Sequence, residues 1–298
     1  MRIVIAGGSG FLGRALADAW RHDGHQVKVL TRRPGALAGD DVRWNPESGG
    51  AWTSALERTD AVVNLAGEGI ADQPWTVARK AAILSSRVTP TRTLADAIRA
   101  CANPPRIFIS ASGIGFYGTP GDQPLTEESA PGSDFLATVC QSWERETAAA
   151  VGVSRIVFLR TGVVLSRDGG ALPRMALPFR FFVGGRLGTG RQYVSWIHRQ
   201  DWVEMVRWAL HSSQISGPLN VTAPGPVTNA EFTIALAAAM RRPAFFPVPA
   251  FVLRGMLGRE MADALLLEGQ RALPRKAETL GFRFRYPTVD AALAAIYA

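Results

Sequence analysis

A glycine-rich turn between an apolar strand and a helix, near residue 1, most limits the folds open to this chain. The segment Arg2–Ala6 predicts a buried strand, and Phe11–His22 predicts a helix. Between them lie Gly7, Gly10 and Gly13, with the spacing Gly-x-x-Gly-x-x-Gly. In this context the first glycine permits a tight turn, the second allows a ligand close to the backbone, and the third lets the helix pack on the strand. The pattern predicts the first unit of a nucleotide-binding α/β sheet.

Short apolar strands alternate with helical segments through the first half of the chain. Further strands are expected at 26–30, 61–66, 106–110 and 155–159, and helices near 77–101 and 135–151. Such alternation favours parallel pairing and right-handed crossovers. The predicted fold class is α/β, with a doubly wound parallel Rossmann sheet and a smaller C-terminal substrate domain.

The alternation ends after about residue 161, where glycine, proline and aromatic residues become frequent. We expect a strand at 219–222 and later helices near 201–211, 229–240, 249–257, 261–267 and 288–297. Residues 1–165, completed by roughly 197–224, are predicted to form the nucleotide-binding domain. Residues 166–298 are predicted to supply mainly substrate-side or lid segments, with a small C-terminal domain at about 248–298.

The glycine loop and the end of the second strand together indicate the cofactor. A helix N-terminus with free N–H groups suits a pyrophosphate. An NAD site would add an Asp or Glu about 20 residues past the loop to bind the ribose 2′-OH. Here the strand ends in Thr31, Arg32 and Arg33, whose guanidinium groups suit a 2′-phosphate. We therefore predict NADP(H); the alternatives are a glycine turn without a ligand and arginines that only face solvent.

Composition limits the other partners. The net charge of +8 could indicate nucleic-acid binding, but no basic run is interleaved with aromatic residues. We expect a small-molecule substrate, no nucleic acid and no metal, since no His/Cys/Glu cluster has ligand spacing. The two cysteines match no redox pattern, and neither a signal peptide nor a stretch of about 18 apolar residues is present. A cytoplasmic protein without a membrane span is predicted.

Several motifs besides the glycine loop point to one family. These are Asn64-Leu65-Ala66-Gly67, Ser110-Ala111-Ser112, SASGIGFYG, LRTGVVLSRDGGALPRM, the SWIH stretch and LLLEGQRALPRKAETLGFRFRYP. With them the chain resembles the extended short-chain dehydrogenases/reductases, and more closely their atypical NAD-dependent epimerase/dehydratase-like subgroup 39U. The resemblance covers nearly the whole chain, includes the subgroup's small C-terminal domain, and leaves a homodimer open. The predicted cofactor-binding residues are Gly7, Ser9, Gly10, Phe11, Leu12, Gly13, Thr31, Arg32, Arg33, Leu65, Ala66, Gly67 and Arg87.

The wider family uses a Tyr-x-x-x-Lys pair, with a Ser and an Asn, to move a proton. By spacing from Ser112 and Glu144, that pair would fall at Leu136 and Cys140, and no tyrosine of this chain has a lysine four residues on. Ser112 matches the family's active-site serine, and Arg87 stands where the family often has Asn. The usual mechanism is therefore absent from this sequence.

Four residues are candidates for the catalytic role: Ser112, Tyr117, Glu68 and Cys140. Tyr117 is expected at the carboxyl edge of the sheet, where ligands bind; alternatively it packs with its hydroxyl bound to backbone. Glu68 could act as a base or a substrate anchor, or could pair on the surface. Cys140 could be a weak acid, or a small buried apolar residue.

The predicted substrate-binding residues are Arg186, Arg191, Gln192 and His198. The first three lie where extended family members meet a nucleotide-sugar diphosphate, although ordinary solvated surface is the alternative. His198 could titrate near neutral pH or be structural, and Asp201 is predicted to cap the helix that it precedes.

The predicted function is that of an NADP(H)-binding oxidoreductase or epimerase-like enzyme. Its substrate would be small and hydroxylated or anionic, in the manner of a nucleotide sugar. The alternative is a non-catalytic NADP(H)-binding redox sensor or regulatory protein, because fold and cofactor alone do not establish turnover.

Overall fold

A parallel sheet of seven strands forms the centre of the computed structural model, which describes residues 1–32 and 41–298. The strand order is β11-β7-β5-β4-β1-β2-β3. The strand β1 pairs with β2 on one side and with β4 on the other, so the chain adds β2 and β3 on one side of β1 and the later strands on the other side. This topology confirms the predicted doubly wound Rossmann sheet. The strands are β1 (Arg2–Ala6), β2 (Gln26–Thr31), β3 (Val42–Arg43), β4 (Ala61–Asn64), β5 (Ile107–Gly113), β7 (Arg155–Thr161) and β11 (Gly217–Val221).

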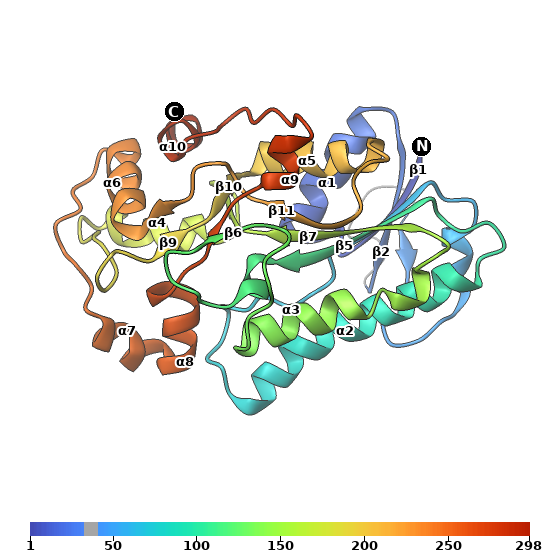
Figure 1. The fold of residues 1–298 in the computed structure, drawn as a ribbon, viewed down its shortest axis with the longest axis horizontal. Coiled ribbons are helices and arrows are strands. Elements are labelled where there is room, and N and C mark those ends of the chain that lie inside the picture. The colour runs from blue at the N-terminus through green and yellow to red at the C-terminus, as the bar shows by residue number, and fades with distance from the viewer. Residues whose placement is uncertain (33–40) are drawn as a thin grey trace.

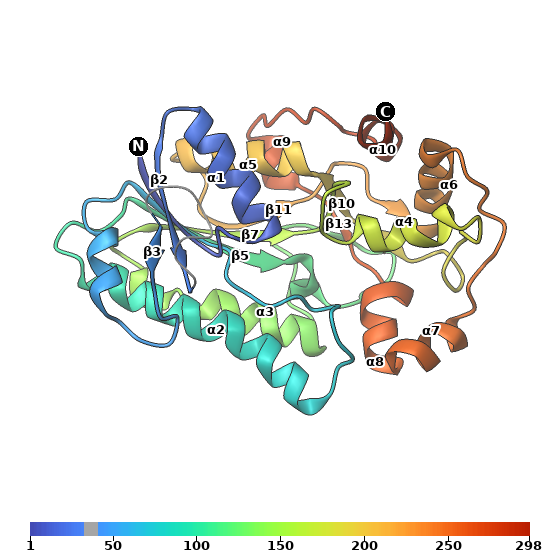
Figure 2. The same cartoon turned by 180° about the vertical axis from the view of Figure 1, so that it is seen from behind.

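Helices cover both faces of this sheet, as Figures 1 and 2 show from opposite sides. The β1 strand explains why, because its alternate side chains are buried in two different clusters. Ile3 and Ile5 pack with residues of α1 and α5, whereas Val4 and Ala6 pack with residues of α2. A parallel strand buried on both faces is continuously apolar, as this one is. The flanking helices are α1 (Phe11–His22) and α5 (Arg199–His211) on one face, and α2 (Val77–Ala100) and α3 (Phe135–Arg145) on the other.

A second group of helices lies at the end of the molecule far from β2 and β3 (Figure 1). Three of them share a core around Phe232, Leu236 and Leu293. The helices are α4 (Leu172–Arg180), α6 (Asn229–Met240), α7 (Ala250–Leu257), α8 (Arg259–Ala262) and α10 (Val289–Tyr297), with a π-helical turn at Asp263–Leu267. Short pairs join this part to the sheet: β6 (Pro124–Leu125) with β13 (Arg271–Ala272), β8 (Val163–Leu165) with β10 (Trp196–His198), and β9 (Tyr193–Val194) with β12 (Val227–Thr228). The domain boundaries near 165 and 248 stay predictions.

Local differences from the sequence prediction are small and have a physical cause. The helix predicted over 135–151 ends at Arg145 and continues as a 3₁₀ turn at Ala148–Ala150. Thr147 interrupts it, because its hydroxyl donates to the Glu144 carbonyl. Across the described residues, no helix combines the length and apolarity that a membrane crossing requires.

Candidate functional site

The glycine loop is held so tightly that side chains at two of its positions would collide with backbone. Gly7 has φ of +79°, and a Cβ added there would lie 2.6 Å from the Leu65 carbonyl carbon. A Cβ at Gly13 would lie 2.3 Å from the Gly7 carbonyl oxygen. Gly10 is the N-cap of α1 and contributes no side-chain acceptor there. The first N–H groups of α1 can therefore bind an anion at the carboxyl edge of the sheet.

The strip after β4 lies against the glycine loop at Gly7, and buried polar side chains hold this strip in place. Ala66 N donates to the Asn64 Oδ1 atom at 3.1 Å, and Asn64 Nδ2 donates to Thr91 Oγ1 at 2.7 Å. Trp143 Nε1 of α3 donates to the same hydroxyl at 2.9 Å. Neither Asn64 nor Thr91 was assigned a role from the sequence. A polar residue closing the apolar run AVVN was the signal that could have indicated one.

The cofactor residues predicted on β2 lie at its carboxyl end. Thr31 is buried and Arg32 is exposed. Arg33 lies outside the described residues. Arg32 is thus accessible to a ligand on the β2 side of the glycine loop.

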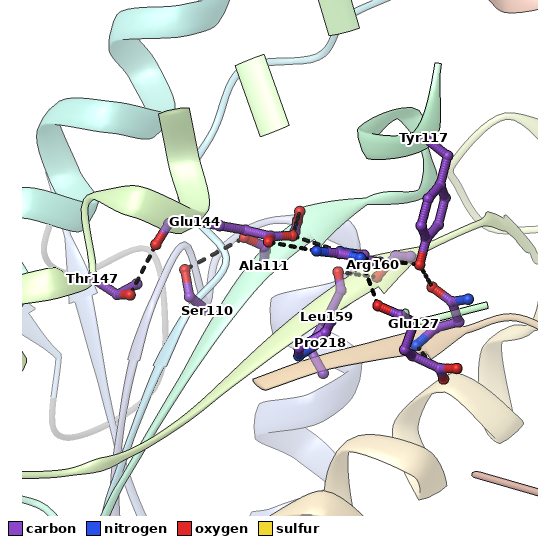
Figure 3. A network of polar contacts seen from close by, with 12 residues as sticks. Ser110, Ala111, Tyr117, Glu127, Glu144, Thr147, Leu159, Arg160 and Pro218 are labelled. Carbon is purple, nitrogen blue, oxygen red and sulfur yellow. Dashed lines mark hydrogen bonds and ion pairs between the residues drawn. The ribbon is translucent and has the colours of Figure 1, made fainter. Parts of the chain in front are cut away.

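Ser112 lies at the end of β5 and its hydroxyl is bound to a buried ion pair. Ser112 Oγ donates to Glu144 Oε1 at 2.8 Å, and the same carboxylate accepts Arg160 Nε at 2.8 Å and Nη2 at 2.9 Å. In the register of β5 and β7, Ser112 lies opposite Arg160, so the sheet itself brings them together. Figure 3 shows Glu144 and Arg160 in line with Tyr117. The pairing of Arg160 with Glu144 was not predicted from the sequence.

Tyr117 and Cys140 are both buried, which works against an acid–base role. The Tyr117 hydroxyl donates to Asn220 Oδ1 at 2.6 Å and accepts from Arg160 Nη1 at 3.1 Å. Burial raises the pKa of Tyr117 to about 12 and the pKa of Cys140 to about 11. The geometry favours the packing interpretation for Tyr117, with side chains rather than backbone as its partners. It likewise favours a small buried thiol at Cys140.

Glu68 lies half-exposed after β4 and is paired on the surface. Its carboxylate accepts Arg79 Nη1 of α2 at 2.5 Å, and its carbonyl accepts Arg87 Nη2 at 2.8 Å. This arrangement favours the surface-pairing interpretation of Glu68. The guanidinium of Arg87, by contrast, contacts the backbone of the strip after β4.

The predicted substrate residues are only partly brought together. Arg186 is exposed and donates to the Thr189 carbonyl, and Arg191 is exposed. Gln192 Nε2 is bound to the carbonyls of Leu187 and Leu266, which ties this segment to the C-terminal part.

The structure favours the structural interpretation of His198, whereas Asp201 differs from the sequence prediction. His198 is buried and is itself the N-cap of α5, accepting Gln200 N at 3.1 Å on Nδ1. Burial, followed by the charges of Arg199 and Arg285, lowers the pKa of His198 to about 4, so it does not titrate near neutral pH. Asp201 is not the cap, because α5 begins earlier. Its carboxylate instead accepts the backbone N–H groups of Arg285 and Tyr286 at 2.9 Å.

Of two cavities among the described residues, the smaller lies between α3 and the segment 259–268. It measures about 370 Å³ and lies between Trp75, Phe135 and Leu136 on one side and Glu260 and Glu268 on the other. Leu136 is the position at which the wider family would have its tyrosine. A cavity of about 640 Å³ lies on the opposite face, against α1 and α5. Of these two cavities, only the smaller one is lined by Leu136, a position of the pair predicted to be missing. Within the described residues, no His, Cys, Asp and Glu side chains group as a metal site would need.

Comparison with known proteins identifies the family. The family model described as NAD dependent epimerase/dehydratase family matches residues 3–222. The chain belongs to this family. A second model, the domain of unknown function DUF1731, matches residues 248–296. The resemblance inferred from the sequence motifs is confirmed.

Relatives of this epimerase/dehydratase chain match it along its full length. An epimerase family protein of Mycobacterium leprae is 43% identical over 292 residues, which are 98% of this chain and 94% of that protein. The crystal structure of human epimerase family protein SDR39U1 with NADPH has a TM-score of 0.92 and 35% identity, and covers 100% of this chain and 99% of that one. A nucleoside-diphosphate sugar epimerase structure from Corynebacterium glutamicum has a TM-score of 0.81 and 37% identity, over 100% of this chain and 58% of that one.

Proposed function

We propose that this protein binds NADP(H) and acts as an oxidoreductase or epimerase-like enzyme on a small hydroxylated substrate, without the usual Tyr-x-x-x-Lys pair. The observation that carries the proposal is the glycine loop, whose Gly7 and Gly13 leave no room for side chains and whose helix N-terminus is open to a pyrophosphate. The human relative crystallised with NADPH supports the same cofactor.

Residues at three places along the edge of the sheet would bind the pyrophosphate, the 2′-phosphate and the nicotinamide half of the cofactor. The loop of Gly7, Ser9, Gly10, Phe11, Leu12 and Gly13 would hold the pyrophosphate. Arg32, with Thr31 and Arg33 beside it, would bind the 2′-phosphate through charge-assisted hydrogen bonds. Leu65, Ala66 and Gly67 would flank the nicotinamide half. When bound, the cofactor supplies hydride transfer at its nicotinamide ring.

The substrate side would be the cavity beside Leu136. Ser112 donates its hydroxyl proton to Glu144, which leaves its oxygen lone pairs as acceptors. Such an oxygen would accept a hydrogen bond from a substrate hydroxyl, and this supports a hydroxylated substrate. Arg186 and Arg191 would serve an anionic group, as in a nucleotide sugar.

Cofactor titration tests the proposal. Purified protein and the Arg32→Ala variant are titrated with NADPH and with NADH, following nicotinamide fluorescence. We expect the wild type to bind NADPH more tightly than NADH. The Arg32→Ala substitution should lower the affinity for NADPH by about tenfold and leave the affinity for NADH unchanged. Equal affinity for both cofactors would contradict the role of Arg32, and absence of binding would contradict the proposed cofactor.

A non-catalytic NADP(H)-binding regulator is the second candidate. The burial of Tyr117 and Cys140 favours it, because neither group is free to replace the missing pair. Stereospecific hydride loss from bound NADPH with any member of a carbonyl panel would exclude this candidate.

A further inference from the structure

Arg87 is a partly buried cation beside the strip that follows β4. A Cβ added at Gly67 would lie 3.3 Å from both Cγ and Cζ of Arg87, so its guanidinium lies directly against this glycine. Nη2 donates to the Glu68 carbonyl at 2.8 Å, and Nη1 donates to the Ile83 carbonyl at 3.0 Å. These contacts hold the guanidinium of α2 at the carboxyl edge of the sheet.

The same guanidinium faces α3 at the position where the pair is missing. Its Cζ lies 5.2 Å from the centroid of the Trp143 ring, and Cys140 is one turn earlier on that helix. The Cys140 sulfur is in turn 3.7 Å from where a Cβ at Gly113 would be. The guanidinium of Arg87 on α2 therefore places a positive charge near position 140, where the wider family would have a lysine on α3.

Arg87 retains hydrogen-bonding capacity after these contacts. Its Nη1 donates hydrogen bonds to the Ile83 carbonyl and the Ser86 hydroxyl, and its Nη2 donates to the Glu68 carbonyl. Its Nε makes no hydrogen bond to any residue in 1–32 or 41–298. Arginine has five N–H donors and no acceptor atoms, so the N–H of Nε and the second N–H of Nη2 can donate to an oxygen of a bound ligand or of solvent.

The place of Arg87 in the cleft indicates which part of a dinucleotide it would meet. In this fold the pyrophosphate lies on the glycine loop and the two nucleotide halves extend to either side of it. Arg32 marks the 2′-phosphate half at β2, whereas Arg87 and Gly67 lie past β4 on the other side of β1. Resting on the proposed NADP(H) binding, we infer that Arg87 replaces the absent lysine and holds the hydroxyls of the nicotinamide ribose through its guanidinium.

Three ligands of increasing length test this inference by calorimetric titration. 2′,5′-ADP lacks the second ribose, 2′-phospho-ADP-ribose includes it, and NADPH adds the nicotinamide. The Arg87→Gln substitution should lower the affinity for 2′-phospho-ADP-ribose and for NADPH by about tenfold. The affinity for 2′,5′-ADP should stay unchanged. Arg87→Met keeps the side-chain volume against Trp143 and should give the same pattern if the Gln variant does not fold. Arg92→Gln is the matched control, since Arg92 lies on the same helix but is exposed and pairs with Glu146, and it should leave all three affinities unchanged.

The possible failures are distinguishable. An equal loss for all three ligands, or no loss for any, would overturn the role of Arg87 while leaving NADP(H) binding intact. If the wild type bound none of the three, the proposed function itself would be wrong, and the inference with it. Thermal unfolding of each variant shows whether a loss of affinity reflects a loss of fold.

Discussion

Glu144 on α3 binds the Arg160 guanidinium on β7 through both carboxylate oxygens, from Nε at 2.8 Å and from Nη2 at 2.9 Å. The two side chains are only 11% and 5% exposed. Arg160 also donates to Tyr117, whose hydroxyl donates to Asn220 on β11. The pair therefore joins α3 to β7 and, through Tyr117, to β11 (Figure 3).

Breaking this ion pair should strongly destabilise the protein. Arg160→Met leaves the Glu144 carboxylate buried without its cation, which costs about 3–5 kcal/mol of unfolding free energy. Urea unfolding measures the loss. The double variant Arg160→Met with Glu144→Met removes both charges and should recover part of it. A double variant whose loss equals the sum of the two single losses would show that the side chains are not coupled.

Tyr117→Phe should affect stability rather than ligand binding. It leaves Asn220 Oδ1 and one Arg160 N–H without their partner, which costs about 1–3 kcal/mol. The NADPH affinity should stay within twofold of the wild type in the same fluorescence titration. Unchanged stability together with a loss of turnover on any substrate found would instead support the acid role first considered for Tyr117.

The pH dependence of stability should reflect His198. Its pKa is about 4 in the folded protein, against an ordinary value of about 6.5, so between these values the unfolded chain binds a proton that the folded one does not. The unfolding free energy should therefore rise with pH from about 4 to 6.5 and be lost as the pH falls, by up to about 3 kcal/mol.

His198→Asn keeps a side-chain acceptor at the N-cap and should flatten this dependence. Burial raises the pKa of the neighbouring Asp201, which acts in the opposite sense. Because Asp201 is present in both proteins, the difference between their curves isolates His198. Parallel curves from pH 5 to 7.5 would mean that the histidine is not held neutral.

A methyl group should have opposite effects at two glycines. Gly13→Ala places Cβ 2.3 Å from the Gly7 carbonyl oxygen and should cost at least about 2 kcal/mol and abolish NADPH binding. Gly255 lies inside α7 with nothing within 4 Å of an added Cβ. Gly255→Ala should stabilise the protein by about 0.5–1 kcal/mol without changing NADPH affinity. Circular dichroism melts and fluorescence titration compare the two, and an unaffected Gly13→Ala would contradict the tight loop.

The sequence alone predicted the strand–loop–helix start and the α/β class, because these depend on the local spacing of apolar residues and glycines. It also located Ser112 and the missing Tyr-x-x-x-Lys pair, since both are matters of position along the chain. Helix ends such as the start of α5 were less well placed, because a cap depends on which side chain turns back onto the backbone.

The contacts of the polar side chains, in contrast, depend on the three-dimensional packing of the chain. Ser112 and Arg160 are far apart in the sequence and meet through the register of β5 and β7. The pKa of His198 is low chiefly because tertiary packing buries its side chain, and then because of the charges of Arg199 beside it and of Arg285 from the C-terminal part. The contacts of Arg87 with Gly67 and Trp143 could not be predicted from the sequence, because they follow from how α2 packs against α3 and the strip after β4. Burial and electrostatics act through space, and a pattern of neighbours along the chain does not contain them.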